Sequence, residues 1–92
     1  MKVVIILPTY NERGNIAALL TSLSGEFRRL AHDMHILVVD DNSPDGTADI
    51  VRAAMPEMSF LHLITGAKAG LGAAYIRGMR YALDELEADV VF

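Results

Sequence analysis

Residues 36–46 read Ile-Leu-Val-Val-Asp-Asp-Asn-Ser-Pro-Asp-Gly, a short apolar run followed directly by residues that favour turns. A continuous apolar run of this length is typical of a strand that is covered on both faces of a sheet. Ser43 followed by Pro44 fits the N-cap and the first position of a helix. We therefore expect a buried strand, a turn, and a short helix over about 44–54 that ends before Pro56.

The same alternation between strand and helix patterns continues in both directions along the chain. Apolar runs at 3–7 and 60–64 predict two further strands, and a run beginning at Val90 predicts a fourth. Apolar residues with helical spacing, preceded by Asn11 or Asn15 as N-cap, lie between the first two strands: Ile16, Leu19, Leu20, Leu23, Phe27 and Leu30. A helix expected over 73–87 has a second such face: Tyr75, Ile76, Met79, Leu83 and Leu86.

The order β-α-β-α-β-α-β predicts an α/β fold with a parallel sheet. Crossovers of this length join parallel strands in a right-handed sense, with helices on both faces of the sheet. We expect the fourth strand to lie beside the first. Ligands of such sheets bind beyond the carboxyl ends of the strands, where the strand order reverses. The loops at 8–14, 40–46 and 65–72 are therefore expected to form the functional site.

Composition excludes several classes of protein. The 92 residues include no cysteine, which excludes disulfide-stapled miniproteins and cysteine-ligated zinc or iron–sulfur sites. Eight Lys and Arg against twelve Asp and Glu give a net charge of −4, and the basic residues are scattered, so no nucleic-acid partner is expected. With 52% hydrophobic and 22% charged residues, the chain is too apolar for disorder and too often interrupted by charge for a membrane span.

The two ends of the chain also carry information. The apolar run that follows Met1-Lys2 stops at Pro8 without a small-residue cleavage site, which favours a strand over a signal peptide. The apolar run at 88–92 stops inside the fourth expected strand. We therefore expect the chain to be the front of a longer protein.

The first two loops carry side chains that suit a nucleotide or a sugar. Tyr10 can pack on a base or ribose, and Glu12 can accept hydrogen bonds from hydroxyl or N–H groups. The alternative is a solvated loop in which Glu12 and Arg13 help the next helix begin. Asp40 and Asp41 end a strand, the position from which a carboxylate reaches a ribose or base. Because adjacent strand residues point to opposite faces, we expect one to face the ligand and the other to support the loop, rather than both to hold one ion.

The third loop gives a weaker indication. Gly70 and Gly72 allow the backbone to approach a ligand closely at a helix N-terminus, with Lys68 nearby as a cation. Neither the dinucleotide-binding glycine fingerprint nor a P-loop is complete, and a merely flexible connection is the alternative. The three histidines lack metal-ligand spacing, so structural or exposed roles are expected for them.

Three motifs occur in order and together cover nearly the whole chain. They are VIILPTYNE at 4–12, VVDDNSPDGT at 38–47, and GLGAAY at 70–75 followed by Gly78. Together they resemble the family 2 glycosyltransferases and, within that family, the dolichyl- or polyprenyl-phosphate mannosyltransferases. The resemblance implies a GT-A fold whose N-terminal half binds a nucleotide-diphosphate sugar. Residues 1–92 would be that part, truncated before the D-x-D motif that follows the fourth strand.

The resemblance also implies roles for individual residues. The nucleotide-sugar pocket would be lined by Pro8, Tyr10, Glu12, Val39 and Asp41. In that pocket Val39 would contact the base, and Asp41 would hydrogen-bond the base or ribose. The supporting residues would be Asp40, Lys68, Gly70 and Gly72. No catalytic residue and no metal ligand is identified within the chain.

The implied activity is the inverting transfer of a hexose, mannose from GDP-mannose in this subgroup, to a dolichyl or polyprenyl phosphate. It implies a divalent ion, Mg or Mn, with ligands mostly outside this chain. It also implies a cytoplasmic, membrane-associated parent protein and a fragment that is inactive alone. Because the fourth expected strand is cut short, we expect the isolated fragment either to be marginally stable or to self-associate through exposed sheet and helix faces. A non-catalytic nucleotide-binding or receiver-like module is the alternative, although a receiver would have an Asp where Ile64-Thr65 end the third strand.

Overall fold

The computed structural model of the chain describes residues 1–66 and 72–92 in full and the backbone of Leu71. The predictions for Lys68 and Gly70 therefore lie outside the described residues. In chain order the elements are β1 (Lys2–Thr9), α1 (Ile16–Phe27), β2 (Asp33–Asp40), α2 (Thr47–Ala54), the 3₁₀ helix η1 (Met55–Glu57), β3 (Leu61–Thr65), α3 (Leu71–Asp84) and β4 (Val90–Val91). Among these helices, none is long and apolar enough to cross a membrane.

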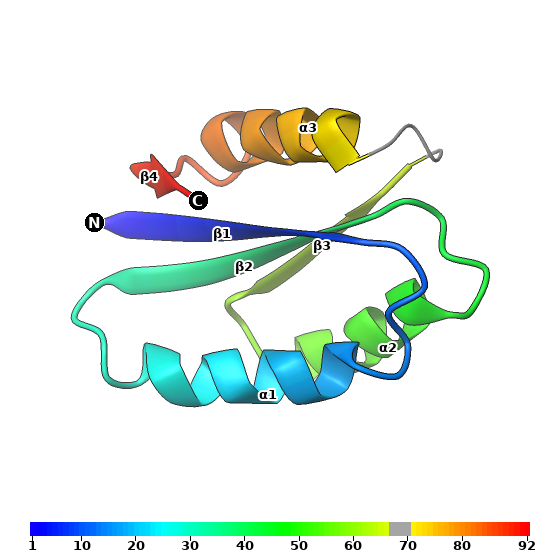
Figure 1. Cartoon of the computed structure of the whole chain (residues 1–92). Coiled ribbons are helices and arrows are strands. Elements are labelled where there is room, and N and C mark those ends of the chain that lie inside the picture. The colour runs from blue at the N-terminus through cyan, green and yellow to red at the C-terminus, as the bar shows by residue number, and fades with distance from the viewer. Residues whose placement is uncertain (67–70) are drawn as a thin grey trace.

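The strands form one parallel sheet in the order β3-β2-β1-β4, as the sequence predicts. β1 and β2 pair along their whole length, from Lys2 opposite Asp33 to Thr9 opposite Asp40. The chain moves from β1 to β3 in one direction and then crosses back to β4. Because each crossover is right-handed, α1 and α2 cover one face and α3 covers the other (Figure 1). The order reverses between β1 and β4, which is where the fold is expected to bind a ligand.

Two apolar cores follow from the two faces of the sheet. Under α1 and α2 the fully buried side chains are Ile16, Leu20, Ile36, Val38, Val51 and Leu61. Under α3 they are Val4, Ile6, Leu37, Val39, Ala74 and Ala82. Successive residues of β2 alternate between the two cores, because side chains of a strand point to opposite faces. The continuous apolar run at 36–39 is thus explained by coverage of β2 on both sides.

The face by which α3 contacts the sheet differs from the expected one. It consists of the small residues Ala74, Gly78 and Ala82, which recur every four positions. A Cβ on Gly78 would lie 2.9 Å from Cγ2 of both Ile6 and Val39, so the helix rests almost directly on the strands. Three residues predicted to be buried are instead exposed, Ile76 by 56%, Met79 by 38% and Leu83 by 51%. Tyr75 and Leu86 remain partly buried against the core, as expected.

The expected boundaries of α1 and α2 also require correction. α1 ends at Phe27, so Leu30 lies beyond it, 49% exposed, and Leu19 is 43% exposed. Asn15 occupies the N-cap position without a side-chain cap hydrogen bond.

α2 begins at Thr47 rather than near residue 44, preceded by Gly46 with φ of 88°. Ser43 does not cap it, because its hydroxyl is hydrogen-bonded to Asp40 instead.

Candidate functional site

The loops that follow β1 and β2 lie at the carboxyl edge of the sheet, where β3 also ends (Figure 1). Pairing continues one residue past each strand. The Asp41 N–H donates to the Thr9 carbonyl at 3.1 Å, and the Gly66 N–H donates to the Asp40 carbonyl at 3.1 Å. Tyr10, Asp41 and Gly66 therefore follow one another across the edge. The structure thus brings the first two predicted loops together with the start of the third, at Thr65 and Gly66.

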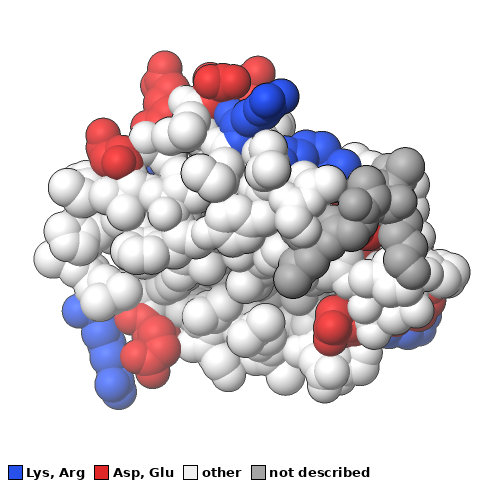
Figure 2. All heavy atoms as spheres, turned by 45° about the horizontal axis from the view of Figure 1, so that its top comes forward, with Lys and Arg blue, Asp and Glu red and all other residues white. Residues whose placement is uncertain are grey.

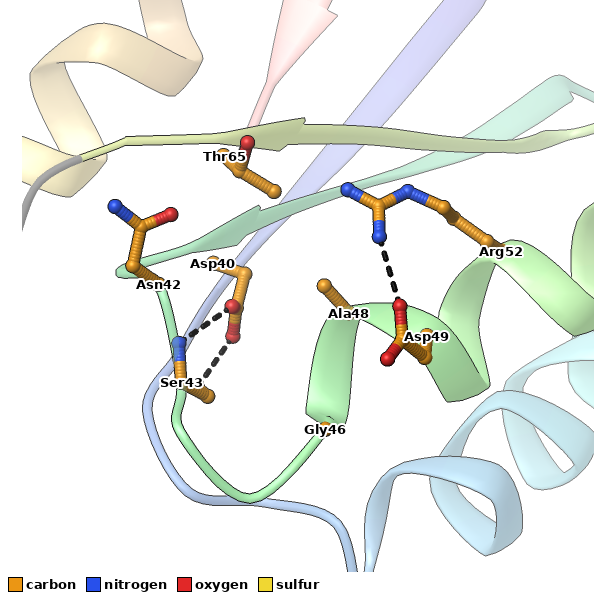
Figure 3. A pocket seen from close by; sticks show the side chains of 8 residues that line it. All are labelled: Asp40, Asn42, Ser43, Gly46, Ala48, Asp49, Arg52 and Thr65. Carbon is orange, nitrogen blue, oxygen red and sulfur yellow. Dashed lines mark hydrogen bonds and ion pairs between the residues drawn. The ribbon is translucent and has the colours of Figure 1, made fainter.

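Asp40 supports the loop that follows it. Its carboxylate is fully buried and accepts hydrogen bonds from the Thr9 hydroxyl at 2.7 Å and from the Ser43 N–H and hydroxyl at 2.9 and 2.6 Å. It points toward the α2 side of the sheet, into a pocket that also contains the Arg52–Asp49 ion pair (Figure 3). Three hydrogen bonds to one buried carboxylate satisfy it within the protein, so Asp40 holds the turn in shape.

Asp41 points the other way, toward α3. Its side chain is 8% exposed, and its Oδ1 pairs with Nη2 of Arg77 at 3.2 Å. The prediction that the two adjacent carboxylates diverge is confirmed. The sequence did not single out Arg77, although a signal for it existed: the small residues at 74, 78 and 82 mark the face of α3 that meets the sheet, and residue 77 borders that face.

A set of hydrogen bonds, here called the loop clamp, joins the first loop to the second. Three consecutive backbone N–H groups, of Asn11, Glu12 and Arg13, donate to Ser43 Oγ, Thr47 Oγ1 and Asp45 Oδ2 at 2.9, 3.0 and 3.1 Å. The Arg13 guanidinium adds a bond to the Asp45 carbonyl at 3.0 Å. The second loop is therefore more than a turn, because its side chains set the course of the first loop. Arg13 takes part in the loop clamp, so the first loop is held by contacts with the second and is not purely solvated.

Local backbone geometry explains several residues of these two loops. Asn11 and Asn42 adopt positive φ values of 57° and 52°, a conformation that Asn tolerates better than most residues. The hydrogen bond from the Thr47 hydroxyl, followed by those from the Arg13 and Thr47 N–H groups, lowers the pKa of Asp45 against the opposing effect of desolvation. Asp45 thus accepts hydrogen bonds from Arg13 in the first loop and from Thr47 at the end of the second.

The remaining predicted site residues lie in different surroundings. Pro8 and Glu12 line a pocket of about 260 Å³ between the end of β1 and the start of α1. Tyr10 is 39% exposed at the edge. Val39 is fully buried beneath α3, so its side chain presents no surface in this chain. At Gly72 an added Cβ would meet no atom within 4 Å, so packing inside the chain does not require a glycine there.

Two histidines interact near the amino ends of the strands, away from the loops. The rings of His35 and His62 stack with centroids 5.1 Å apart, and a ring nitrogen of each lies 2.9 Å from one of the other. His35 also contacts Asp33 at 2.9 Å. Burial, followed by the nearby His35 and Lys2, lowers the pKa of His62. These contacts give the pair a structural place in the sheet.

The residues available at the edge do not fit a divalent metal ion. No group of three or more His, Asp or Glu side chains among the described residues converges on one point. Asp40 and Asp41 diverge and are each engaged within the protein. The described part of the chain therefore offers no ligand set for a divalent ion at this edge.

Comparisons with known proteins agree with this geometry. Residues 4–91 match the family described as "Glycosyl transferase family 2". The chain is 39% identical to the polyprenol monophosphomannose synthase of Mycolicibacterium smegmatis, over 89% of this chain and 30% of that protein. It is 41% identical to the undecaprenyl-phosphate mannosyltransferase of Micrococcus luteus, over 97% of this chain and 38% of that protein.

A solved structure shares the architecture. It is a mannosyltransferase from Pyrobaculum calidifontis in complex with GDP-Man and Mn2+, with a TM-score of 0.67 and 27% identity. The likeness covers 87% of this chain and 24% of that one. The chain thus spans between about a quarter and two fifths of the proteins it matches.

Proposed function

The chain belongs to glycosyltransferase family 2, and from that premise we propose that residues 1–92 are the N-terminal, nucleotide-sugar-binding part of a longer GT-A catalytic domain. The longer protein transfers a hexose, mannose from GDP-mannose, to a polyprenyl phosphate with inversion at the sugar carbon. The names of two relatives, each containing a polyprenyl-type phosphate and mannose, support this acceptor and sugar. The GDP-Man complex of the structural neighbour supports the donor.

The observation that carries the proposal is the row formed by Tyr10 and Asp41 at the carboxyl edge. Tyr10, 39% exposed, brings to this edge an aromatic side chain of the kind that packs on a base or ribose, and Asp41 brings a nearly buried carboxylate that can accept from hydroxyl or N–H donors. Pro8 and Glu12 add a pocket beside the same strand end. We assign these residues to the nucleotide, while Val39 packs beneath α3 and Asp40 fixes the turn.

The chemistry of the proposed reaction divides the work between this chain and the rest of the protein. A phosphate acceptor is already ionised at neutral pH and needs little help from a general base. A divalent ion, Mg or Mn, would neutralise the departing diphosphate, and we assign its ligands to residues outside those described here. A polyprenyl chain is carried by a lipid bilayer, so we propose that the longer protein works at the cytoplasmic surface of a membrane.

A transfer assay tests the proposal. The 92-residue chain and a longer protein that contains it are each incubated with labelled GDP-mannose or UDP-glucose, polyprenyl phosphate, and Mg or Mn. We expect only the longer protein to form lipid-linked mannose, and we expect it to form none in excess chelator. Transfer from UDP-glucose in preference to GDP-mannose would contradict the proposed donor, and robust transfer by the 92-residue chain would contradict the division of work.

Asp41→Ala tests the assignment of the site. It should weaken binding of GDP-mannose to the longer protein by about 1–3 kcal/mol, the cost of losing a hydrogen bond to a charged group. Asp49→Ala is the matched control, because Asp49 is an exposed carboxylate that forms an ion pair with Arg52, also on α2. Calorimetry that shows equal effects of the two substitutions would remove Asp41 from the site.

A further inference from the structure

We propose that Arg77 is a positioning residue, which fixes the carboxylate of Asp41 for the nucleotide, and that Gly66 is the residue that admits the Arg77 guanidinium to its place. The inference rests on the proposed function in one respect, namely that Asp41 faces the nucleotide. It goes beyond that function by naming the residues on α3 and after β3 that set the orientation of Asp41.

Arg77 and Asp41 are in direct contact. Nη2 of Arg77 lies 3.2 Å from Oδ1 of Asp41, and the Asp41 side chain is 8% exposed against 35% for Arg77. A nearly buried carboxylate requires a partner, and Arg77 is the charged one that the described residues provide. No hydrogen bond from the described part of the chain reaches Asp41 Oδ2. Among the described residues, the ion pair therefore engages only one oxygen of Asp41, Oδ1.

The guanidinium of Arg77 also lies very close to Gly66. A Cβ on this residue would lie 2.7, 2.8 and 2.9 Å from the Cζ, Nη1 and Nη2 atoms of Arg77. The guanidinium thus lies directly against the backbone of residue 66. That backbone is held by its own hydrogen bond to the Asp40 carbonyl. Any side chain at position 66 would displace the guanidinium, since the flexible Arg side chain moves more easily than the strand end.

The position of Arg77 leaves one of its buried polar groups unsatisfied by the described residues. Nε of Arg77 is buried and has no hydrogen-bond acceptor among them, whereas buried polar groups in proteins are almost always paired. The position of Arg77 is fixed from behind by the neighbouring Gly78, which rests on Ile6 and Val39. Stability is given up at Nε while the contact with Asp41 is kept, as expected of a residue that positions another.

The test measures binding of GDP to the 92-residue chain by titration calorimetry. Arg77→Ala should weaken binding about tenfold, the effect of a lost charge-assisted hydrogen bond. Arg77→Lys keeps the charge without the planar fork and should restore part of the affinity. Gly66→Ala should match Arg77→Ala, although it leaves the arginine in the sequence. The double variant Gly66→Ala/Arg77→Ala should bind no more weakly than either single variant, because both remove one contact.

The matched control is Arg80→Ala, which removes an equal charge from an exposed position one turn along α3 and should leave binding unchanged. Thermal melting followed by circular dichroism verifies that each variant is folded. Wild-type affinity in Arg77→Ala, with binding lost in Asp41→Ala, would overturn this inference and leave the proposed function standing. Additive losses in the double variant would also overturn it. Failure of the unaltered chain to bind GDP would overturn both.

Discussion

Asp45 is the residue on which the loop clamp depends most. Its Oδ1 accepts hydrogen bonds from the N–H and hydroxyl of Thr47, and its Oδ2 accepts one from the N–H of Arg13. These bonds favour the charged carboxylate and so lower the pKa of Asp45 below the ordinary value of 3.8. A group whose pKa is lowered by folding contributes stability above its unfolded pKa and loses that contribution as the pH falls through the folded pKa.

We therefore expect the clamp to persist at pH 3.8 and to open only on further acidification. Amide signals of Arg13 and Thr47, followed by NMR during an acid titration, should shift with one midpoint below 3.8. Asp45→Asn keeps the size of the side chain but loses one acceptor, so both amides should already be shifted at neutral pH. A midpoint at or above 3.8 would show that the hydrogen bonds do not hold this carboxylate.

The sequence predicted which residues reach the carboxyl edge, but it did not predict their partners. Strand alternation was enough to predict that Asp40 and Asp41 diverge. The clamp could not be predicted in this way, because it joins residues separated by 32 to 35 positions. Local turn preferences alone assigned Ser43 to a helix cap, whereas a buried carboxylate three residues earlier competes for the same hydroxyl.

At the scale of elements, the position of α3 depends on Gly78. Replacing it with Ala inserts a methyl group 2.9 Å from two buried, β-branched side chains that have little room to move. We expect Gly78→Ala to destabilise the fold by about 1–3 kcal/mol through overpacking. Urea unfolding measures this difference in the free energy of unfolding.

Gly25→Ala provides the matched control for that measurement. Gly25 lies inside α1, where an added Cβ meets no atom within 4 Å. The same substitution should therefore stabilise the protein there by about 0.5–1 kcal/mol, as expected for Ala in a helix interior. If both variants gained stability, α3 would not rest on the sheet at Gly78.

The same glycine explains why the apolar face of α3 was predicted wrongly. Periodicity of large apolar residues selected Ile76, Met79 and Leu83, and these are exposed. A helix that lies very close to a sheet contacts it through small residues, and such a stripe carries little hydrophobic signal. Strand order and the number of layers, by contrast, depend on runs of apolar residues and on handedness, so they could be predicted from the sequence.

At the scale of the whole molecule, the side that carries α3 and β4 leaves large apolar residues exposed. β4 pairs with Val3 and Val4, and Phe92 beyond it accepts a hydrogen bond from the Ile6 N–H and donates one to the Val4 carbonyl. The surface turned forward in Figure 2, which includes the α3 side, has few charged residues in its middle and more at its rim. Exposed large apolar residues include Ile76, Met79 and Leu83 of α3, and Phe92 after β4. Such a surface tends to associate with another apolar surface.

We expect the isolated chain to self-associate through the exposed apolar residues of α3, which are Ile76, Met79 and Leu83. Ile76→Lys/Leu83→Lys should shift sedimentation velocity profiles toward the monomer, because two charges then repel across the contact. Ala18→Lys/Ser22→Lys adds the same charge at exposed positions of α1 and should leave the profile unchanged. If the unaltered chain were monomeric and highly stable, the exposed apolar residues of α3 would not drive self-association.

The central claim is that the carboxyl edge binds the nucleotide. Titration of the 15N-labelled chain with GDP, followed by two-dimensional NMR, tests it residue by residue. The account predicts shifts concentrated at Tyr10, Glu12, Asp41 and Gly66 and absent at the opposite edge, at Lys2, Asp33 and Asp89. Shifts concentrated at that opposite edge, or none at millimolar GDP, would contradict it.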